Sequence, residues 1–208
     1  MLGQRECGMV KGGEWYNYFW QVINPAFGVF PEAWEKWNKV FDTMYGPQAE
    51  FFNKYLPDKE KTFLGLGVGF GGMELVLASR GWRGLGIDND EHALLIASQN
   101  ANILASNRLM VCHVDIYDKS QFPGFFSGKG FSACLSFGTM EHFKPEEIPE
   151  MIQRQFQIAP LVICMVPVGT EGTLKYFGAS DVGPYLDEKS GIYRVLQTPE
   201  WWEKNIFG

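Results

Sequence analysis

The sequence predicts an α/β protein built on a doubly wound, mainly parallel sheet with an N-terminal aromatic helical cap, and three observations carry this prediction. After Lys61, short apolar runs alternate with helical patterns, which is typical of strand–helix units in a parallel sheet. The first apolar run leads into a glycine-rich turn at residues 67–72. Before residue 60, 14 of the 32 aromatic residues lie between positions 15 and 55, on segments with helical spacing. We therefore expect a cap over residues 1–60 and an α/β core over residues 61–208.

Caps and chain breakers set the bounds of the expected elements. Asp88-Asn89-Asp90 follows the second strand and can cap a helix that begins at Glu91, on which Leu94, Ala97, Ala101 and Leu104 share one face. Pro145-Glu146-Glu147 suits the first turn of a later helix. The first expected strand lies in the unit 62–69 and leads into the glycine-rich turn at 67–72. The other expected strands are 84–87, 109–114, 131–137 and 161–166, and the expected helices are 73–80, 91–107, one opened by Pro145, and 198–204.

Composition excludes several classes of function. The 208 residues, 46% of them hydrophobic, suffice for one domain with a sizeable core. A net charge of −6 supplies no positive field, so we predict no nucleic-acid partner. The longest apolar run, 159–168, has about half of the 20 residues that a membrane helix needs, and the first residues are polar, which predicts a cytoplasmic protein without a membrane span. Cys112, Cys134 and Cys164 lie in apolar runs without CxxC spacing, so we predict buried free thiols and no metal site.

The glycine-rich turn is the first feature that points to a ligand. Glycines at 67, 69 and 71 let a ligand approach the backbone, where the N–H groups of the next helix face it. Asp88 ends the following strand about twenty residues later, where a carboxylate can accept hydrogen bonds from a ribose diol. Two ligand classes fit: a dinucleotide such as NAD, read through Gly67-x-Gly69-x-x-Gly72, or S-adenosylmethionine, read through Gly67-x-Gly69-x-Gly71. A tight turn without a ligand is the alternative.

Two later strand ends favour S-adenosylmethionine. Asp115 can accept from an adenine amino group while Ile116 lines the ring, and the strand 131–137 opens into polar residues at the carboxyl edge of the sheet. In this order, residues 64–71, residues 84–88, His113-Val114-Asp115-Ile116 and the segment from 131 to Glu141-His142-Phe143 resemble the motifs of class I S-adenosylmethionine-dependent methyltransferases, of the small-molecule type whose fourth motif ends in EHF.

The resemblance spans residues 62–167 and implies a Rossmann-like sheet that binds S-adenosylmethionine and releases S-adenosylhomocysteine. The cofactor-binding residues that it implies are Gly67, Val68, Gly69, Gly71, Asp88, Asn89, Asp115, Ile116, Ser136 and Phe137.

The chain departs from this family at two points. Family members usually carry Asp or Glu where this chain has Gly65, and that carboxylate helps to hold the cofactor's ammonium group, so we expect weaker binding or a substitute from the aromatic cap. The family's sheet also has two more strands after the helix expected at 198–204. We expect the sheet to be shortened, to use residues 191–197 instead, or to have its C-terminal edge covered by a partner such as a second copy in a homo-oligomer.

Methyl transfer requires in-line approach of a nucleophile, removal of its proton and exclusion of water. His142 is the predicted general base, because an imidazole accepts protons near neutral pH, and Glu141 is predicted to act with it. The alternative is that both residues cap the next helix or bind the cofactor. The predicted substrate-binding residues are aromatic: Trp15, Tyr18, Trp20, Phe143 and Tyr176. For the aromatics of the cap, plain hydrophobic packing is the alternative.

These residues together predict a S-adenosylmethionine-dependent methyltransferase acting on a small molecule, by O- or N-methyl transfer. The chain has no Asn/Asp-Pro-Pro-Tyr string, in which enzymes that methylate base amines or glutamine amides resemble one another. Two alternatives stay open. One is an NAD-linked oxidoreductase, and the other is a degenerate methyltransferase-fold protein that binds a nucleoside or a partner without turnover.

Overall fold

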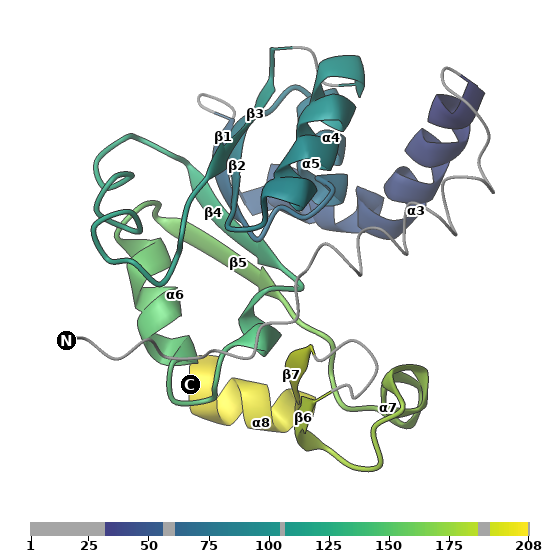
Figure 1. Cartoon of the computed structure of the whole chain (residues 1–208), viewed down its shortest axis with the longest axis vertical. Coiled ribbons are helices and arrows are strands. Elements are labelled where there is room, and N and C mark those ends of the chain that lie inside the picture. The colour runs from purple at the N-terminus through teal and green to yellow at the C-terminus, as the bar shows by residue number, and fades with distance from the viewer. Residues whose placement is uncertain (1–31, 56–60, 105–106, 187–191, 208) are drawn as a thin grey trace.

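A five-stranded parallel sheet forms the centre of the molecule (Figure 1). The computed structural model describes residues 32–55, 61–104, 107–186 and 192–207. The strands run in the order β3-β2-β1-β4-β5, and each pairs with its neighbours in parallel. Their bounds are Thr62–Leu66 for β1, Arg83–Asp88 for β2, Leu109–His113 for β3, Ala133–Phe137 for β4 and Leu161–Met165 for β5. This order confirms the predicted doubly wound fold and places its switch point between β1 and β4, where such sheets bind ligands.

Helices cover both faces of the sheet. In Figure 1, α3 (Glu32–Tyr55), α4 (Gly72–Ser79) and α5 (Glu91–Leu104) lie to one side of the sheet, and α6 (Ile148–Phe156) lies to the other. Side chains of β1 alternate between the two sides: Phe63 packs with Phe52 of α3, whereas Leu64 and Leu66 pack with Ile148 of α6. Of the predicted cap, the described part is α3, and it belongs to the same apolar cluster as α4.

The predicted cap of α5 is confirmed. The Oδ1 atom of Asp90 accepts hydrogen bonds from the backbone N–H groups of His92, at 2.8 Å, and Ala93, at 3.2 Å. These bonds satisfy two of the donors that a helix leaves open at its start. The segment that follows β2 therefore begins its helix where the sequence predicts.

Within the described residues, the sheet ends at β5, so it is shortened at this edge. The next strands, β6 (Gly183–Leu186) and β7 (Tyr193–Leu196), form a separate antiparallel pair. β7 lies within the segment 191–197 that we considered as a replacement strand, but it pairs with β6 and not with β5. It packs against the short turn η1 (Met140–His142) that follows β4. The remaining elements are α7 (Glu171–Phe177), α8 (Pro199–Trp202) and one π-helical segment, Glu203–Phe207.

The prediction of buried thiols was wrong at one position. Cys134 is buried and Cys164 is partly buried, but Cys112 is exposed. The reason is the place of β3 at the edge of the sheet, where Met110, on the same face of the strand as Cys112, is 67% exposed. The apolar run 109–114 therefore contains an edge strand whose Met110 and Cys112 side chains are exposed to solvent. Across the described residues, no helix combines the length and the apolar character that a bilayer crossing requires.

Candidate functional site

The turn after β1 closes on the carboxylate at the end of β2. The backbone N–H of Gly69 donates to Oδ2 of Asp88 over 3.0 Å, and the N–H of Asp90 donates to Oδ1 of Asp88 over 3.0 Å. The N–H groups of Gly67 and Val68 both donate to the carbonyl of Ile87. The predicted glycine turn and the predicted ribose-binding acid are therefore one hydrogen-bonded unit.

The geometry of this turn depends on glycine at three positions. Gly67, Gly69 and Gly71 have φ values of +64°, +53° and +84°, in the left-handed region that side chains disfavour. A Cβ at Gly67 would also lie 2.5 Å from Oγ1 of Thr139. That hydroxyl is buried and donates to the carbonyl of Leu66 over 2.9 Å. The contact ties the end of β1 to the segment after β4, so the glycine turn and the predicted catalytic segment share one edge of the sheet.

Burial sets the electrostatics of Asp88. Burial is the main influence on its pKa and raises it, and the charge of Asp90 acts in the same direction. The hydrogen bonds from Gly69 and Asp90 oppose this and favour the ionised form. The side chain is still partly exposed, so it can accept hydrogen bonds from a ligand.

The ends of β2 and β3 bring the predicted adenine-binding residues to the same edge. Oδ1 of Asp115 accepts from the N–H of Tyr117 over 2.9 Å, which folds the chain into a tight turn. Ile116 is partly buried beside the α6-side core. Asn89 is exposed, and its carbonyl lies 3.2 Å from Nε2 of His113.

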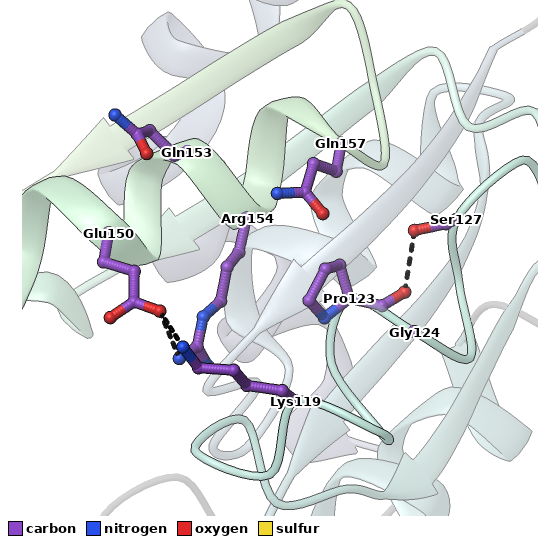
Figure 2. Close-up of a pocket in the computed structure, with 8 residues that line it drawn as sticks. All are labelled: Lys119, Pro123, Gly124, Ser127, Glu150, Gln153, Arg154 and Gln157. Carbon is purple, nitrogen blue, oxygen red and sulfur yellow. Dashed lines mark hydrogen bonds and ion pairs between the residues drawn. The ribbon is translucent and has the colours of Figure 1, made fainter.

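A groove lies between α6 and the loop that follows Asp115, and a side chain of α6 holds this loop in place. Figure 2 shows Arg154 of α6 reaching toward the 115–127 loop, with Glu150 and Lys119 paired beside it. Nη1 of Arg154 donates to the carbonyl of Ile116 over 3.1 Å. The residues that line the groove are Lys119, Pro123, Gly124, Ser127, Glu150, Gln153, Arg154 and Gln157. None of them is a predicted site residue, so we assign the groove a supporting role.

The two predicted catalytic residues lie on η1. Nδ1 of His142 lies 2.7 Å from the carbonyl of Tyr193 on β7. Because a carbonyl can only accept, Nδ1 carries the proton and Nε2 keeps a lone pair. Nε2 lies 3.9 Å from Oε1 of Glu141. The side chain of His142 is 36% exposed.

Opposite pKa shifts mark this pair. Burial, with the charge of Arg194 as a smaller cause, lowers the pKa of His142, and hydrogen bonding to the backbone of Tyr193 and Gly138 opposes the shift. Burial raises the pKa of Glu141 to about 7, and its Oε2 atom has no hydrogen-bond partner among the described residues. His142 is therefore neutral at pH 7, as a general base must be, beside a carboxyl that titrates near neutrality.

The remaining predicted cofactor- and substrate-binding residues differ in how far they are buried. Ser136 is fully buried and donates to Sγ of Cys164 over 3.1 Å, whereas Phe137 packs on Phe52 of α3 with ring centroids 6.2 Å apart. Phe143 is 2% exposed in the core, so it packs rather than lines an open surface, and Tyr176 on α7 is 82% exposed. Trp15, Tyr18 and Trp20 lie outside the described residues. In the described part of the chain, no three metal-binding side chains come together.

Glu74 is a candidate site residue that the sequence analysis did not identify. It lies in the first turn of α4, is 5% exposed, and places its carboxylate against the backbone of Gly65. A carboxylate from α4 therefore lies beside the strand position where the sequence lacks one, whereas residues 1–31 of the predicted cap lie outside the described residues. The available signal was a single acid in the otherwise uncharged stretch 72–79, nine residues after a glycine where an acid is expected.

No protein-family model and no curated protein matches this chain. Solved structures match it by fold. A S-adenosylmethionine-dependent methyltransferase from Anabaena variabilis aligns with a TM-score of 0.61 at 17% identity, over 93% of this chain and 79% of that one. The magnesium protoporphyrin IX methyltransferase of Synechocystis, solved with bound S-adenosylhomocysteine, aligns at 0.55 and 20% identity, over 80% and 77%.

A third structure, of a S-adenosylmethionine-dependent methyltransferase from Methanosarcina mazei, aligns at 0.57 and 18% identity, over 74% of this chain and 81% of that one. Identities this low establish the fold and not the reaction, because one fold supports many activities. The chain has the Rossmann-like fold of S-adenosylmethionine-dependent methyltransferases.

Proposed function

We propose that this protein is a S-adenosylmethionine-dependent methyltransferase that acts on a small molecule. The observation that carries the proposal is the closure of the glycine turn on Asp88 at the switch point of the sheet, with a 3.0 Å bond from Gly69 to the carboxylate. Asp115 follows the neighbouring strand β3 at the same edge of the sheet. Three adjacent strand ends therefore offer groups for the methionine, ribose and adenine parts of one ligand.

The residues fit this cofactor. The turn presents backbone without side chains at Gly67 and Gly69, and Asp88 keeps a partly exposed carboxylate for the ribose hydroxyls. Solved structures of the same fold hold S-adenosylhomocysteine, the product of this cofactor. When bound, the cofactor supplies a methyl group on a positively charged sulfur, which makes the methyl carbon electrophilic.

The chain's own residues supply the proton chemistry. With the cofactor bound, the acceptor's lone pair would form a bond to the methyl carbon, and the electrons of the carbon–sulfur bond would stay on the cofactor's sulfur. The acceptor's proton passes to Nε2 of His142, whose lone pair is free because Nδ1 donates to Tyr193. The carboxyl of Glu141, 3.9 Å away, then stabilises the imidazolium.

The small-molecule assignment rests on charge and on the absence of a nucleic-acid motif. A net charge of −6 disfavours a polyanionic substrate, and the Asn/Asp-Pro-Pro-Tyr string is missing. One structural neighbour is a methyltransferase of magnesium protoporphyrin IX. We also propose that Trp15, Tyr18, Trp20 and Tyr176 contact the acceptor. A cytoplasmic location and a second copy that covers the β5 edge belong to the same proposal.

Calorimetric titration with S-adenosylmethionine, S-adenosylhomocysteine and NAD tests the proposal. We expect the two adenosyl ligands to bind and NAD to give no signal. Asp88→Asn should weaken both adenosyl ligands about 10- to 100-fold, because it removes charge-assisted hydrogen bonds. Asp181→Asn, a change of the same chemistry on an exposed loop, should leave them unchanged.

Three outcomes would contradict the proposal. Binding of NAD in place of the adenosyl ligands would support an oxidoreductase. Silence from all three ligands would remove the cofactor assignment. Binding without methyl transfer, across a panel of small acceptors and a labelled methyl donor, would identify a binding protein without turnover.

A further inference from the structure

Glu74 is a buried carboxylate without a positive partner among the residues that the structure describes. An acid in the first turn of a helix is favoured by the helix dipole, but that benefit does not require burial. Glu74 is nevertheless 5% exposed, and no described lysine, arginine or histidine forms an ion pair with it. Burying an unpaired charge is costly, so the placement calls for a compensating cation.

The absence of a side chain at Gly65 leaves space for the carboxylate of Glu74. Gly65 lies on β1, two residues before the glycine turn begins, and a Cβ there would overlap Oε1 of Glu74 and lie 3.1 Å from its Cγ. Any other residue at position 65 would displace the carboxylate. Glu74 thus reaches from α4 back to the end of β1, beneath the turn.

Aromatic rings and a second acid surround the same place. Rings of Tyr45 and Phe70 lie within 2.8 Å of where a Cβ on Gly72 would stand, and they cover the start of α4. The negative charge of Asp88 acts on Glu74 from β2, and that of Glu74 acts on Tyr45 of α3. Two carboxylates therefore flank one glycine turn in an environment that strengthens their attraction for a positive group.

We propose that Glu74 binds the ammonium group of the cofactor's methionine part, supplying from α4 the carboxylate that β1 lacks at Gly65. This inference rests on the proposed function, because it presupposes an adenosyl ligand with an amino acid end at the turn. Such a ligand brings the missing cation to the buried acid. Burial, with Asp88 as a smaller cause, raises the pKa of Glu74 to about 7, and a bound ammonium would reverse that shift.

Two ligands that differ only in the amino acid end separate this role from general damage. S-adenosylhomocysteine carries the ammonium, whereas 5′-methylthioadenosine keeps the adenosine and the thioether without it. By calorimetry, Glu74→Gln should weaken S-adenosylhomocysteine about 10- to 100-fold and change 5′-methylthioadenosine by less than about twofold. Glu203→Gln, an exposed acid near the C-terminus, should change neither.

Moving the carboxylate provides the second arm. The double variant Gly65→Glu/Glu74→Ala places the carboxylate on β1 instead of α4. Removing the side chain of Glu74 provides the space that the new glutamate needs. Affinity for S-adenosylhomocysteine should recover at least tenfold relative to Glu74→Ala alone.

Equal weakening of both ligands by Glu74→Gln, or no weakening of either, would overturn the role of Glu74 while leaving the cofactor assignment in place. Failure of the unaltered protein to bind any adenosyl ligand would instead overturn the proposed function, and this inference with it.

Discussion

Glu74→Gln should change how the stability of the free protein depends on pH. A carboxyl whose pKa is higher in the folded than in the unfolded state holds its proton more tightly when folded. The cost of burying its charge is therefore absent below its ordinary pKa of 4.5, grows as the pH rises, and levels off above about 7. Glutamine keeps the size of the side chain and carries no charge at any pH, so it removes this dependence.

The size of the effect follows from the pKa. A rise from 4.5 to about 7 corresponds to about 3 kcal/mol, at about 1.4 kcal/mol for each pKa unit. For a chain of this length, 1 kcal/mol changes the melting temperature by about 2–4 °C, so the full effect is about 6–12 °C. Glu141, whose pKa is also raised to about 7, contributes equally to both proteins and cancels in the difference.

Urea unfolding of the ligand-free protein at pH 5 and pH 8 measures this difference. Glu74→Gln should gain about 2–3 kcal/mol relative to the unaltered protein between the two pH values. The exposed control Glu203→Gln should gain nothing. If the curves of the unaltered protein and Glu74→Gln fall in parallel, Glu74 is not the buried, unpaired acid that its surroundings indicate.

Three further predictions concern the site and its supports. His142→Ala should lower turnover about 100-fold or more while leaving affinity for S-adenosylhomocysteine within about twofold, measured by labelled methyl transfer and calorimetry; equal losses would make His142 a structural residue. Thr139→Val should cost about 1–3 kcal/mol in urea unfolding, because it leaves the carbonyl of Leu66 without its buried donor. Gly84→Ala should cost about 1–3 kcal/mol because its Cβ would overlap the ring of Phe63, and adding Phe63→Leu should recover part of the loss; additive losses would show that the ring is not the obstacle.

The order of elements was predictable because each carries a local signal. Alternating apolar runs and helical patterns predicted all five strands of the sheet, and Asp90 marked the start of α5. Errors fell at strand ends. The strand expected over 131–137 begins only at Ala133, and the strand expected over 161–166 ends at Met165.

Long-range arrangement was not predictable in the same way. No local pattern states that β7 pairs with β6 and not with β5, or that β3 lies at an edge and exposes Cys112. Within the site, sequence spacing placed Asp88 beside the glycine turn, since both follow neighbouring strands. Glu74 was not identified because a residue on the inner face of a helix is expected to pack against the sheet. Only the structure shows that Glu74 lies opposite Gly65, where the strand has no side chain.

The exchange between Gly65 and Glu74 links stability to binding. A charge buried without a partner destabilises the free protein, and any ligand that supplies the partner stabilises the folded state through its binding. The part of the pH dependence that Glu74 causes and the 10- to 100-fold of affinity that it gives an ammonium-bearing ligand should therefore be lost together in Glu74→Gln. If the pH dependence vanished while that affinity survived, the buried charge would be a cost with no ligand to offset it, and another group would have to hold the ammonium.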